Sequence, residues 1–83
     1  MNAANATETK AAALLANPIV KIMADRYGAG PIRGCATVVE WAALHYAEQV
    51  GAPAAKAALR KLNKARERLG AMPCYVPYGS PLF

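Results

Sequence analysis

Three side chains in this sequence could act as a nucleophile, a base or a soft metal ligand: Cys35, Cys74 and the single histidine, His45. A catalytic thiol needs a base within hydrogen-bond reach. If Cys35 and His45 lie on one helix, they are ten residues apart, which separates them by about 15 Å along its axis. Cys74 reaches His45 only if the end of the chain folds back in one particular way. We therefore expect no thiol catalysis, and we expect His45 to be a packed or half-exposed residue.

Metal and nucleotide binding also lack the residue spacing that they need. The sequence has no Cys-x-x-Cys and no His-x-x-x-His pair, which are typical of zinc sites. Gly28, Gly30 and Gly34 superficially resemble a nucleotide-binding fingerprint, but no strand precedes them and no Lys-Ser/Thr pair follows. The five acidic residues are scattered and give no acid–base pair. The sequence predicts a protein that is not an enzyme and holds no cofactor or metal.

The clearest functional signal is positive charge between residues 53 and 69. This segment holds six of the ten Lys and Arg residues and one of the five acidic residues, and the rest of the chain is balanced. Like charges four residues apart on a helix cost a few tenths of a kcal/mol per pair. The pattern favours an acidic or phosphate-bearing partner, and a solvated face that keeps a small domain soluble is the alternative. The residues expected to contact the partner form one stripe: Lys56, Arg60, Lys61, Lys64 and Arg68.

The opposite side of this segment is apolar, which predicts a helix packed against protein. Its apolar residues are Ala55, Ala58, Leu59, Leu62, Ala65 and Leu69. Residues 37–50 predict a second helix, and the Val50-Gly51-Ala52-Pro53 corner joins the two into a hairpin. Thr37 and Glu40 fit a capping box at the start of that helix. A start at Pro31 is also open.

The helix expected at residues 37–50 is apolar on more than one side, so we expect it to be central. One broad arc comprises Val38, Val39, Ala42, Tyr46 and Val50. Trp41 and Leu44 point away from that arc, toward the N-terminal helix or a second subunit. Arg66 lies in the apolar arc of its own helix, so we expect it to pair with Glu40 or Glu48 or to lie at a subunit interface. Dimerisation would enlarge the small core of so short a chain, and we expect a homodimer.

The chain before residue 30 predicts two further helical segments. Asn5-Ala-Thr-Glu8 offers a start for an Ala-rich helix that runs to Ala16. Asn17 and Pro18 then favour a fresh or kinked helix up to Tyr27, with Gly28 as a left-handed stop. The buried stripe expected on that helix is Ile19, Ile22, Met23 and Tyr27.

Residues 71–83 differ in composition from the rest, with three prolines, two tyrosines and no charge. Proline excludes a continuous helix here and favours an extended arm. The arm either folds back over the bundle, where it covers Trp41 or Leu44, or swaps onto a second subunit, or docks on a partner through apolar anchors. The anchors expected in the last case are Tyr75, Tyr78, Leu82 and Phe83.

Residues 46–62 resemble the helix-turn-helix of bacterial regulators, with Ala47 at the helix crossing and Gly51 in the turn. The resemblance implies a recognition helix at residues 53–62. Its base-facing positions would be Ala54, Ala55 and Lys56, and its phosphate contacts would be Arg60, Lys61 and Lys64. The turn is one residue shorter than the usual pattern, which places Arg60 at a core position, and both helices are longer than usual. An antiparallel hairpin gives the same Gly-Pro corner.

The sequence therefore predicts an all-α protein, a small three- to four-helix bundle at residues 1–70 followed by an extended arm at 71–83. No apolar run is long enough to span a membrane, and Asn17-Pro18 interrupts the one faint resemblance to a signal segment, so we expect a cytoplasmic protein. We therefore expect Cys35 and Cys74 to be free thiols, and a disulfide that joins the arm to the bundle is the alternative. We expect a regulator or inhibitor that occupies an acidic or nucleic-acid-binding surface, as accessory proteins of phages and mobile elements do against host machinery. The alternative is a dimeric helix-turn-helix DNA-binding regulator.

Overall fold

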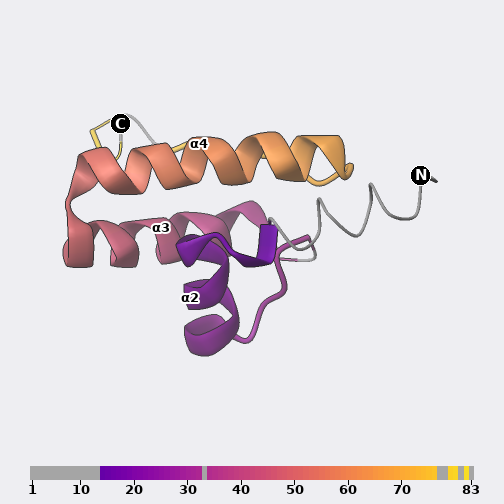
Figure 1. Cartoon of the computed structure of the whole chain (residues 1–83), viewed down its shortest axis with the longest axis horizontal. Coiled ribbons are helices and arrows are strands. Elements are labelled where there is room, and N and C mark those ends of the chain that lie inside the picture. The colour runs from indigo at the N-terminus through magenta and orange to yellow at the C-terminus, as the bar shows by residue number, and fades with distance from the viewer. Residues whose placement is uncertain (1–13, 33, 77–78, 81, 83) are drawn as a thin grey trace.

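The computed structural model describes residues 14–32, 34–76, 79, 80 and 82. Within this part of the chain it contains three helices and no strand: α2 (Pro18–Tyr27), α3 (Ala36–Val50) and α4 (Ala52–Arg68). All three helices contact one another, and α3 and α4 form a hairpin (Figure 1). The expected all-α bundle is confirmed, and the bounds of the hairpin helices lie within one residue of the expected ones. Most of the helix expected at residues 5–16 lies outside the described residues.

The start and the end of α2 follow the sequence signals. The Asn17 side-chain oxygen accepts a hydrogen bond from the Ile19 amide at 2.9 Å, and Pro18 is the first helical residue. Gly28 ends the helix with φ 63°, a left-handed conformation that glycine adopts without strain. The Asn17 amide group also donates to the Ala58 carbonyl at 2.9 Å. One side chain therefore caps α2 and ties it to α4.

The expected capping box at the start of α3 is wrong. The helix begins at Ala36, and its N-cap is Cys35, which makes no side-chain hydrogen bond to the helix. Thr37 consequently lies inside the first turn, where its hydroxyl is past the capping position. A start at Pro31 is wrong as well, because residues 28–32, 34 and 35 are not helical. The Gly34 amide donates to the Gly30 carbonyl at 2.9 Å in this connection.

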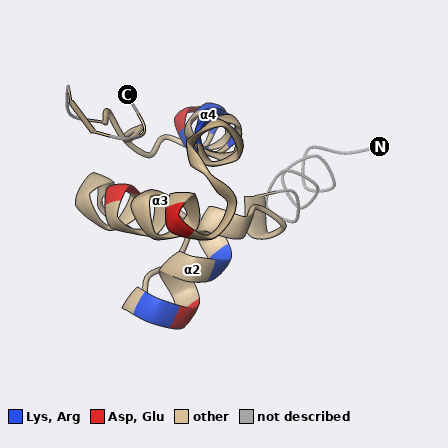
Figure 2. Ribbon diagram, turned by 90° about the vertical axis from the view of Figure 1, so that its left-hand side faces the viewer, with Lys and Arg blue, Asp and Glu red and all other residues tan. Residues whose placement is uncertain are grey.

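The hairpin turns on a single non-helical residue. Gly51 has φ 89° and ψ 157°; its amide donates to the Ala47 carbonyl at 2.8 Å, and its carbonyl accepts from the Ala55 amide at 3.2 Å. It therefore closes α3 and opens α4, and a positive φ at this position favours glycine. In Figure 1 the two helices lie side by side with opposite directions, whereas in Figure 2 α4 is seen end-on and α3 runs across the view. The hairpin therefore crosses obliquely.

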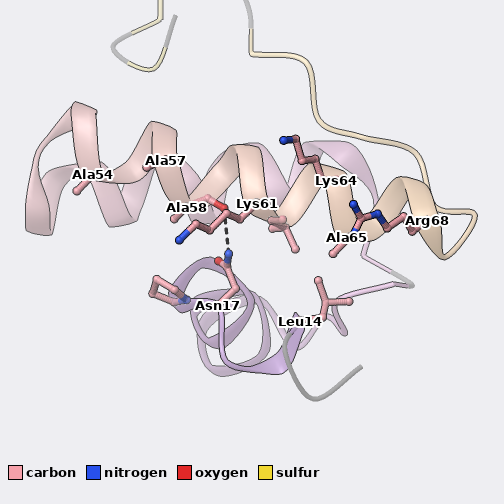
Figure 3. Close-up of a pocket in the computed structure, with 11 residues that line it drawn as sticks. Leu14, Asn17, Ala54, Ala57, Ala58, Lys61, Lys64, Ala65 and Arg68 are labelled. Atoms are coloured by element: carbon pink, nitrogen blue, oxygen red, sulfur yellow. Dashed lines mark hydrogen bonds between the residues drawn. The ribbon is translucent and has the colours of Figure 1, made fainter. Parts of the chain in front are cut away.

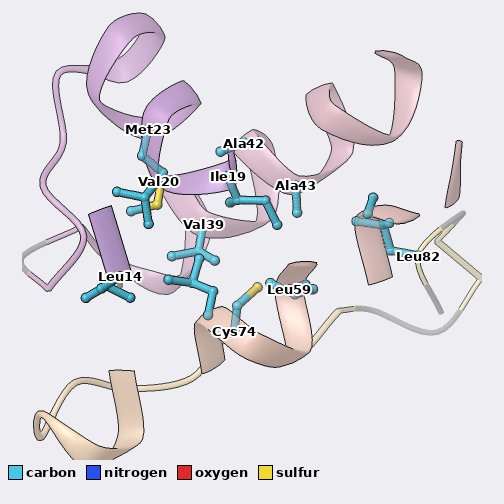
Figure 4. Packing of buried hydrophobic residues seen from close by; sticks show 12 residues of the cluster. Leu14, Ile19, Val20, Met23, Val39, Ala42, Ala43, Leu59, Cys74 and Leu82 are labelled. Carbon is cyan, nitrogen blue, oxygen red and sulfur yellow. The ribbon is translucent and has the colours of Figure 1, made fainter. Parts of the chain in front are cut away.

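The core lies where the three helices meet, and the described part of the C-terminal arm adds to it (Figure 4). Three of its twelve buried apolar residues are alanines, and two of these lie on α3 and one on α4. The stripe expected on α2 is partly corrected: Val20 is buried, whereas Ile22 and Tyr27 are half-buried, because α2 contacts both other helices. Val50 is exposed at the corner. The buried apolar side chains are Leu14, Ile19, Val20, Met23, Val39, Ala42, Ala43, Ala55, Leu59, Leu62, Cys74 and Leu82.

The arm after α4 is attached through Asn63. Its amide group donates to the Cys74 carbonyl, and its oxygen accepts from the Cys74 amide, each at 2.9 Å. This pairing satisfies both backbone groups of Cys74 and places its thiol in the core. None of the helices in the described part of the chain is long and apolar enough to span a membrane.

Candidate partner-binding surface

The five cations predicted to contact a partner are spaced so that they share one broad face of α4, which we call the basic face. Figure 2 shows α4 end-on with its Lys and Arg positions in blue. It is opposite the side on which Ala55, Leu59 and Leu62 enter the core. The fold therefore leaves the charged side of this helix uncovered by the other described elements. Four members are exposed and one is half-buried: Arg60, Lys61, Lys64 and Arg68, and then Lys56.

No Lys or Arg of the basic face makes an ion pair among the described residues. The only approach of a basic to an acidic side chain that the structure shows there is on α3, where His45 Nδ1 lies 3.8 Å from Glu48 Oε2. Glu67 is on α4 itself, is exposed, and makes no ion pair in the described part of the chain. The face carries five cations and the one carboxylate of Glu67, so it keeps a net positive charge.

A groove of about 610 Å³ runs along one flank of the basic face, between α4 and the residues that open α2 (Figure 3). Its apolar wall on α4 is built mainly from alanine, and Leu14, Asn17 and Pro18 form the other wall. The hydrogen bond from Asn17 to the Ala58 carbonyl joins the two walls. We call it the alanine groove; on α4 it is lined by Ala54, Ala57, Ala58, Lys61, Leu62, Lys64, Ala65 and Arg68.

A smaller pocket, about 320 Å³, lies on the other flank of α4, between this helix and the C-terminal arm. Lys56 and Arg60 line it, together with Asn63 and Tyr75. The predicted single stripe is therefore divided: Lys61, Lys64 and Arg68 border the alanine groove, and Lys56 and Arg60 border the arm.

The predicted apolar anchors of the arm differ in their exposure. Tyr75 is 79% exposed beside the basic face. Leu82 is 4% exposed and belongs to the core, so its side chain faces the bundle. Tyr78 and Phe83 lie outside the described residues. Of the four anchors, Tyr75 is the one that the described structure presents to solvent.

The three residues predicted to form an interface also differ in their exposure. Trp41 is 50% exposed, and its ring lies against that of Tyr27, with centroids 5.7 Å apart. Leu44 is half-buried against the core. Arg66, by contrast, is 2% exposed within the single chain.

The predicted ion pair between Arg66 and Glu40 or Glu48 is wrong. Its Nε donates to the Met72 carbonyl at 3.0 Å, its Nη2 to the Gly34 carbonyl at 2.8 Å, and its Nη1 to the Pro31 carbonyl. No carboxylate pairs with it in the described part of the chain. The sequence signals a buried arginine by its place in the apolar arc, but carbonyl acceptors belong to the backbone and have no residue signature.

Burial lowers the pKa of the Arg66 guanidinium, and the charges of Cys74 and Cys35, when these thiols are ionised, raise it. Arginine stays charged at physiological pH in any case. This buried cation holds the α2–α3 loop and the segment after α4 against one helix, and so braces the element that carries the basic face.

The two thiols and the imidazole make no hydrogen bond to one another in the described part of the chain. Cys74 is buried, and burial raises the pKa of its thiol; Glu40 raises it further, and Arg66 lowers it. Cys35 is exposed. The His45 ring contacts Arg26 and Gln49, and no hydrogen bond to either thiol occurs in the described part of the chain. Among those same residues, no three His, Cys, Asp or Glu side chains gather closely enough to hold a metal ion.

The helix-turn-helix resemblance is corrected at one base-facing position. Ala55 is fully buried between the helices, so it cannot face a base edge. Arg60, predicted by the same alignment to fall at a core position, is exposed, and Leu59 and Leu62 fill the core instead. The two helices form a hairpin on one glycine, which is shorter than the turn that the motif requires.

Comparisons with protein-family models, with curated proteins and with solved structures found no match to this chain. Its function has to be argued from its own surface.

Proposed function

We propose that this protein is a non-enzymatic binding protein that regulates or inhibits its partner by covering an acidic surface with the basic face of α4. The observation that carries the proposal is the set of four exposed cations and one half-buried cation on a single helix face, none of which makes an ion pair among the described residues. Such a face attracts acidic surfaces over a distance and increases the rate of encounter.

The way in which α4 is held supports a role in binding. Arg66, Asn17 and Asn63 each connect this helix to another segment of the chain. A helix that is fixed before the encounter loses little conformational freedom on binding, which leaves more of the electrostatic attraction for affinity.

Fluorescence anisotropy with two labelled probes tests the proposal, a poly-glutamate peptide and a mixed-sequence DNA duplex, at low and at near-physiological salt. We expect the peptide to bind at low salt, and we expect Arg60→Glu/Lys64→Glu to abolish binding. A Glu67→Gln variant is the control, because it raises the net charge without altering a cation. Affinity that is unchanged by the double reversal would overturn the proposal.

The second candidate is a dimeric DNA-binding regulator, because Arg60, Lys61 and Lys64 are exposed where the helix-turn-helix resemblance implies phosphate contacts. DNA affinity that rests on phosphate contacts falls steeply as salt rises. Duplex binding that survives near-physiological salt and vanishes in Arg60→Glu/Lys64→Glu would favour this candidate over the first. We also propose a cytoplasmic homodimer with Trp41 as a contact, which light scattering on the protein and on Trp41→Ser checks.

A further inference from the structure

The alanine groove has the length and the composition of a seat for a helix. Its lining on α4 runs from Ala54 to Arg68, a span of about 21 Å at the rise of an α-helix. Small side chains allow a second helix to approach closely, and helix axes pack about 8–10 Å apart where the contact residues are small. A phosphate backbone would gain nothing from an alanine and leucine wall.

The backbone around the groove favours a helical occupant over an extended one. Extended peptides bind mainly by adding a strand to an open sheet edge, and the described residues contain no strand. The α4 backbone bonds within its own helix, so an extended segment in the groove would gain no backbone hydrogen bonds from α4. A helix satisfies its own amides and carbonyls internally.

Charge along the groove is confined to one side. Lys61, Lys64 and Arg68 border it on α4, whereas the described residues of the opposite wall are uncharged. A ligand that fits this groove needs an apolar stripe for the alanine wall and negative charge on the side of the cations. We infer that the groove binds an amphipathic helix of the partner, with an apolar stripe at i, i+3, i+4 and i+7 and with Asp or Glu along one flank. The inference rests on the proposed function, because it specifies the acidic element that the basic face receives.

A designed peptide serves as the probe, with about 16 residues so that its helix covers the groove. It carries Leu and Ala on the stripe and Glu on one flank, and a scrambled peptide of the same composition is its control. We expect the chain to bind the designed peptide at least about tenfold more tightly than the scrambled one, because only the designed peptide presents its apolar and acidic groups together.

Two charge variants form a matched pair, since each removes two cations from the same helix. Lys61→Gln/Arg68→Gln acts on the groove side and Lys56→Gln/Arg60→Gln on the arm side. We expect the first to weaken peptide binding by about tenfold and the second by less than about threefold, because contacts at the site exceed screened attraction from the other flank.

A third variant separates the groove from charge alone. Ala54→Lys/Ala57→Lys changes two exposed positions, adds two positive charges and covers the apolar wall. If the peptide docks as a helix in the groove, it should bind this variant more weakly. If charge alone attracts it, the two added lysines should strengthen its binding. Weaker binding of the designed peptide, with binding of poly-glutamate kept or strengthened, is the expected result.

Several results would overturn the groove assignment. Equal loss in the two glutamine variants, tighter peptide binding by the double-lysine variant, or equal affinity for the scrambled peptide would each do so and leave the proposed function in place. Self-association that the double-lysine variant abolishes would assign the groove to a second copy instead. Poly-glutamate and peptide affinities that neither glutamine variant lowers would overturn the proposed function as well.

Discussion

The two faces of α4 use the same residue type for opposite purposes. Arg66 is 2% exposed and donates to three backbone carbonyls. Arg68, two positions further along and on the other face, is exposed and makes no ion pair in the described part of the chain. A buried cation whose donors are satisfied acts on the stability of the fold. An exposed cation without a partner is free to act on something outside it.

The largest effect that would test this contrast is the loss of Arg66. Arg66→Met keeps much of the apolar volume and leaves three carbonyls without their donor, so we expect it to lower the free energy of unfolding by about 3 kcal/mol or more. Urea unfolding followed by circular dichroism measures the change. Arg68→Met is the matched control and should shift it by less than about 0.5 kcal/mol. Equal unfolding midpoints for the two variants would contradict the role of Arg66 in holding the α2–α3 loop and the segment after α4.

A second test acts on the loop that Arg66 holds. A Cβ at Gly34 would meet the Met23 methyl group and the Gly30 carbonyl, and the second is backbone that cannot move aside. We expect Gly34→Ala to cost about 1–3 kcal/mol of unfolding free energy, as overpacking does. Gly30→Ala is the control, because a Cβ there meets nothing within 4 Å. Thermal unfolding of both variants gives the comparison, and a stable Gly34→Ala would show that the loop does not pack as described.

The sequence could predict features that depend on neighbouring residues, but not features that depend on contacts between distant segments. The hairpin, the Asn17 cap and the Gly28 stop each depend on a few neighbouring residues whose types carry the signal. The contacts of Arg66 depend on carbonyls contributed by residues far along the chain, and any residue type has a carbonyl. The basic face could be predicted as a stripe, but the alanine groove beside it could not, because its second wall comes from residues before α4.

A third test compares the two thiols. Because burial raises the pKa of Cys74 above its ordinary value, the folded state keeps this proton at a pH at which the unfolded chain has lost it. The thiol therefore contributes stability that is fully present below about pH 8.5, the ordinary thiol pKa, and is lost as pH rises above it. We expect the free energy of unfolding to fall by up to about 1.4 kcal/mol per pH unit there. Cys74→Ala should remove this slope, and Cys35→Ala, at the exposed thiol, should keep it; a slope that survives in Cys74→Ala would refute the assignment.

The smallest expected effect on stability is the most informative about the basic face. Lys64 has three like-charged neighbours at three- or four-residue spacing, Arg60, Lys61 and Arg68, and one opposite charge, Glu67. Lys64→Gln relieves more repulsion than the attraction it removes, so we expect a stability gain of a few tenths of a kcal/mol at low salt. Added salt should close this gap by screening the same repulsion in the original chain. The same substitution should weaken binding of poly-glutamate, which anisotropy measures beside the unfolding curves. A residue that improves binding and slightly impairs folding is what a functional face predicts; Lys64→Gln that lowers stability, or leaves affinity unchanged, would instead make this cation part of an ordinary solvated surface.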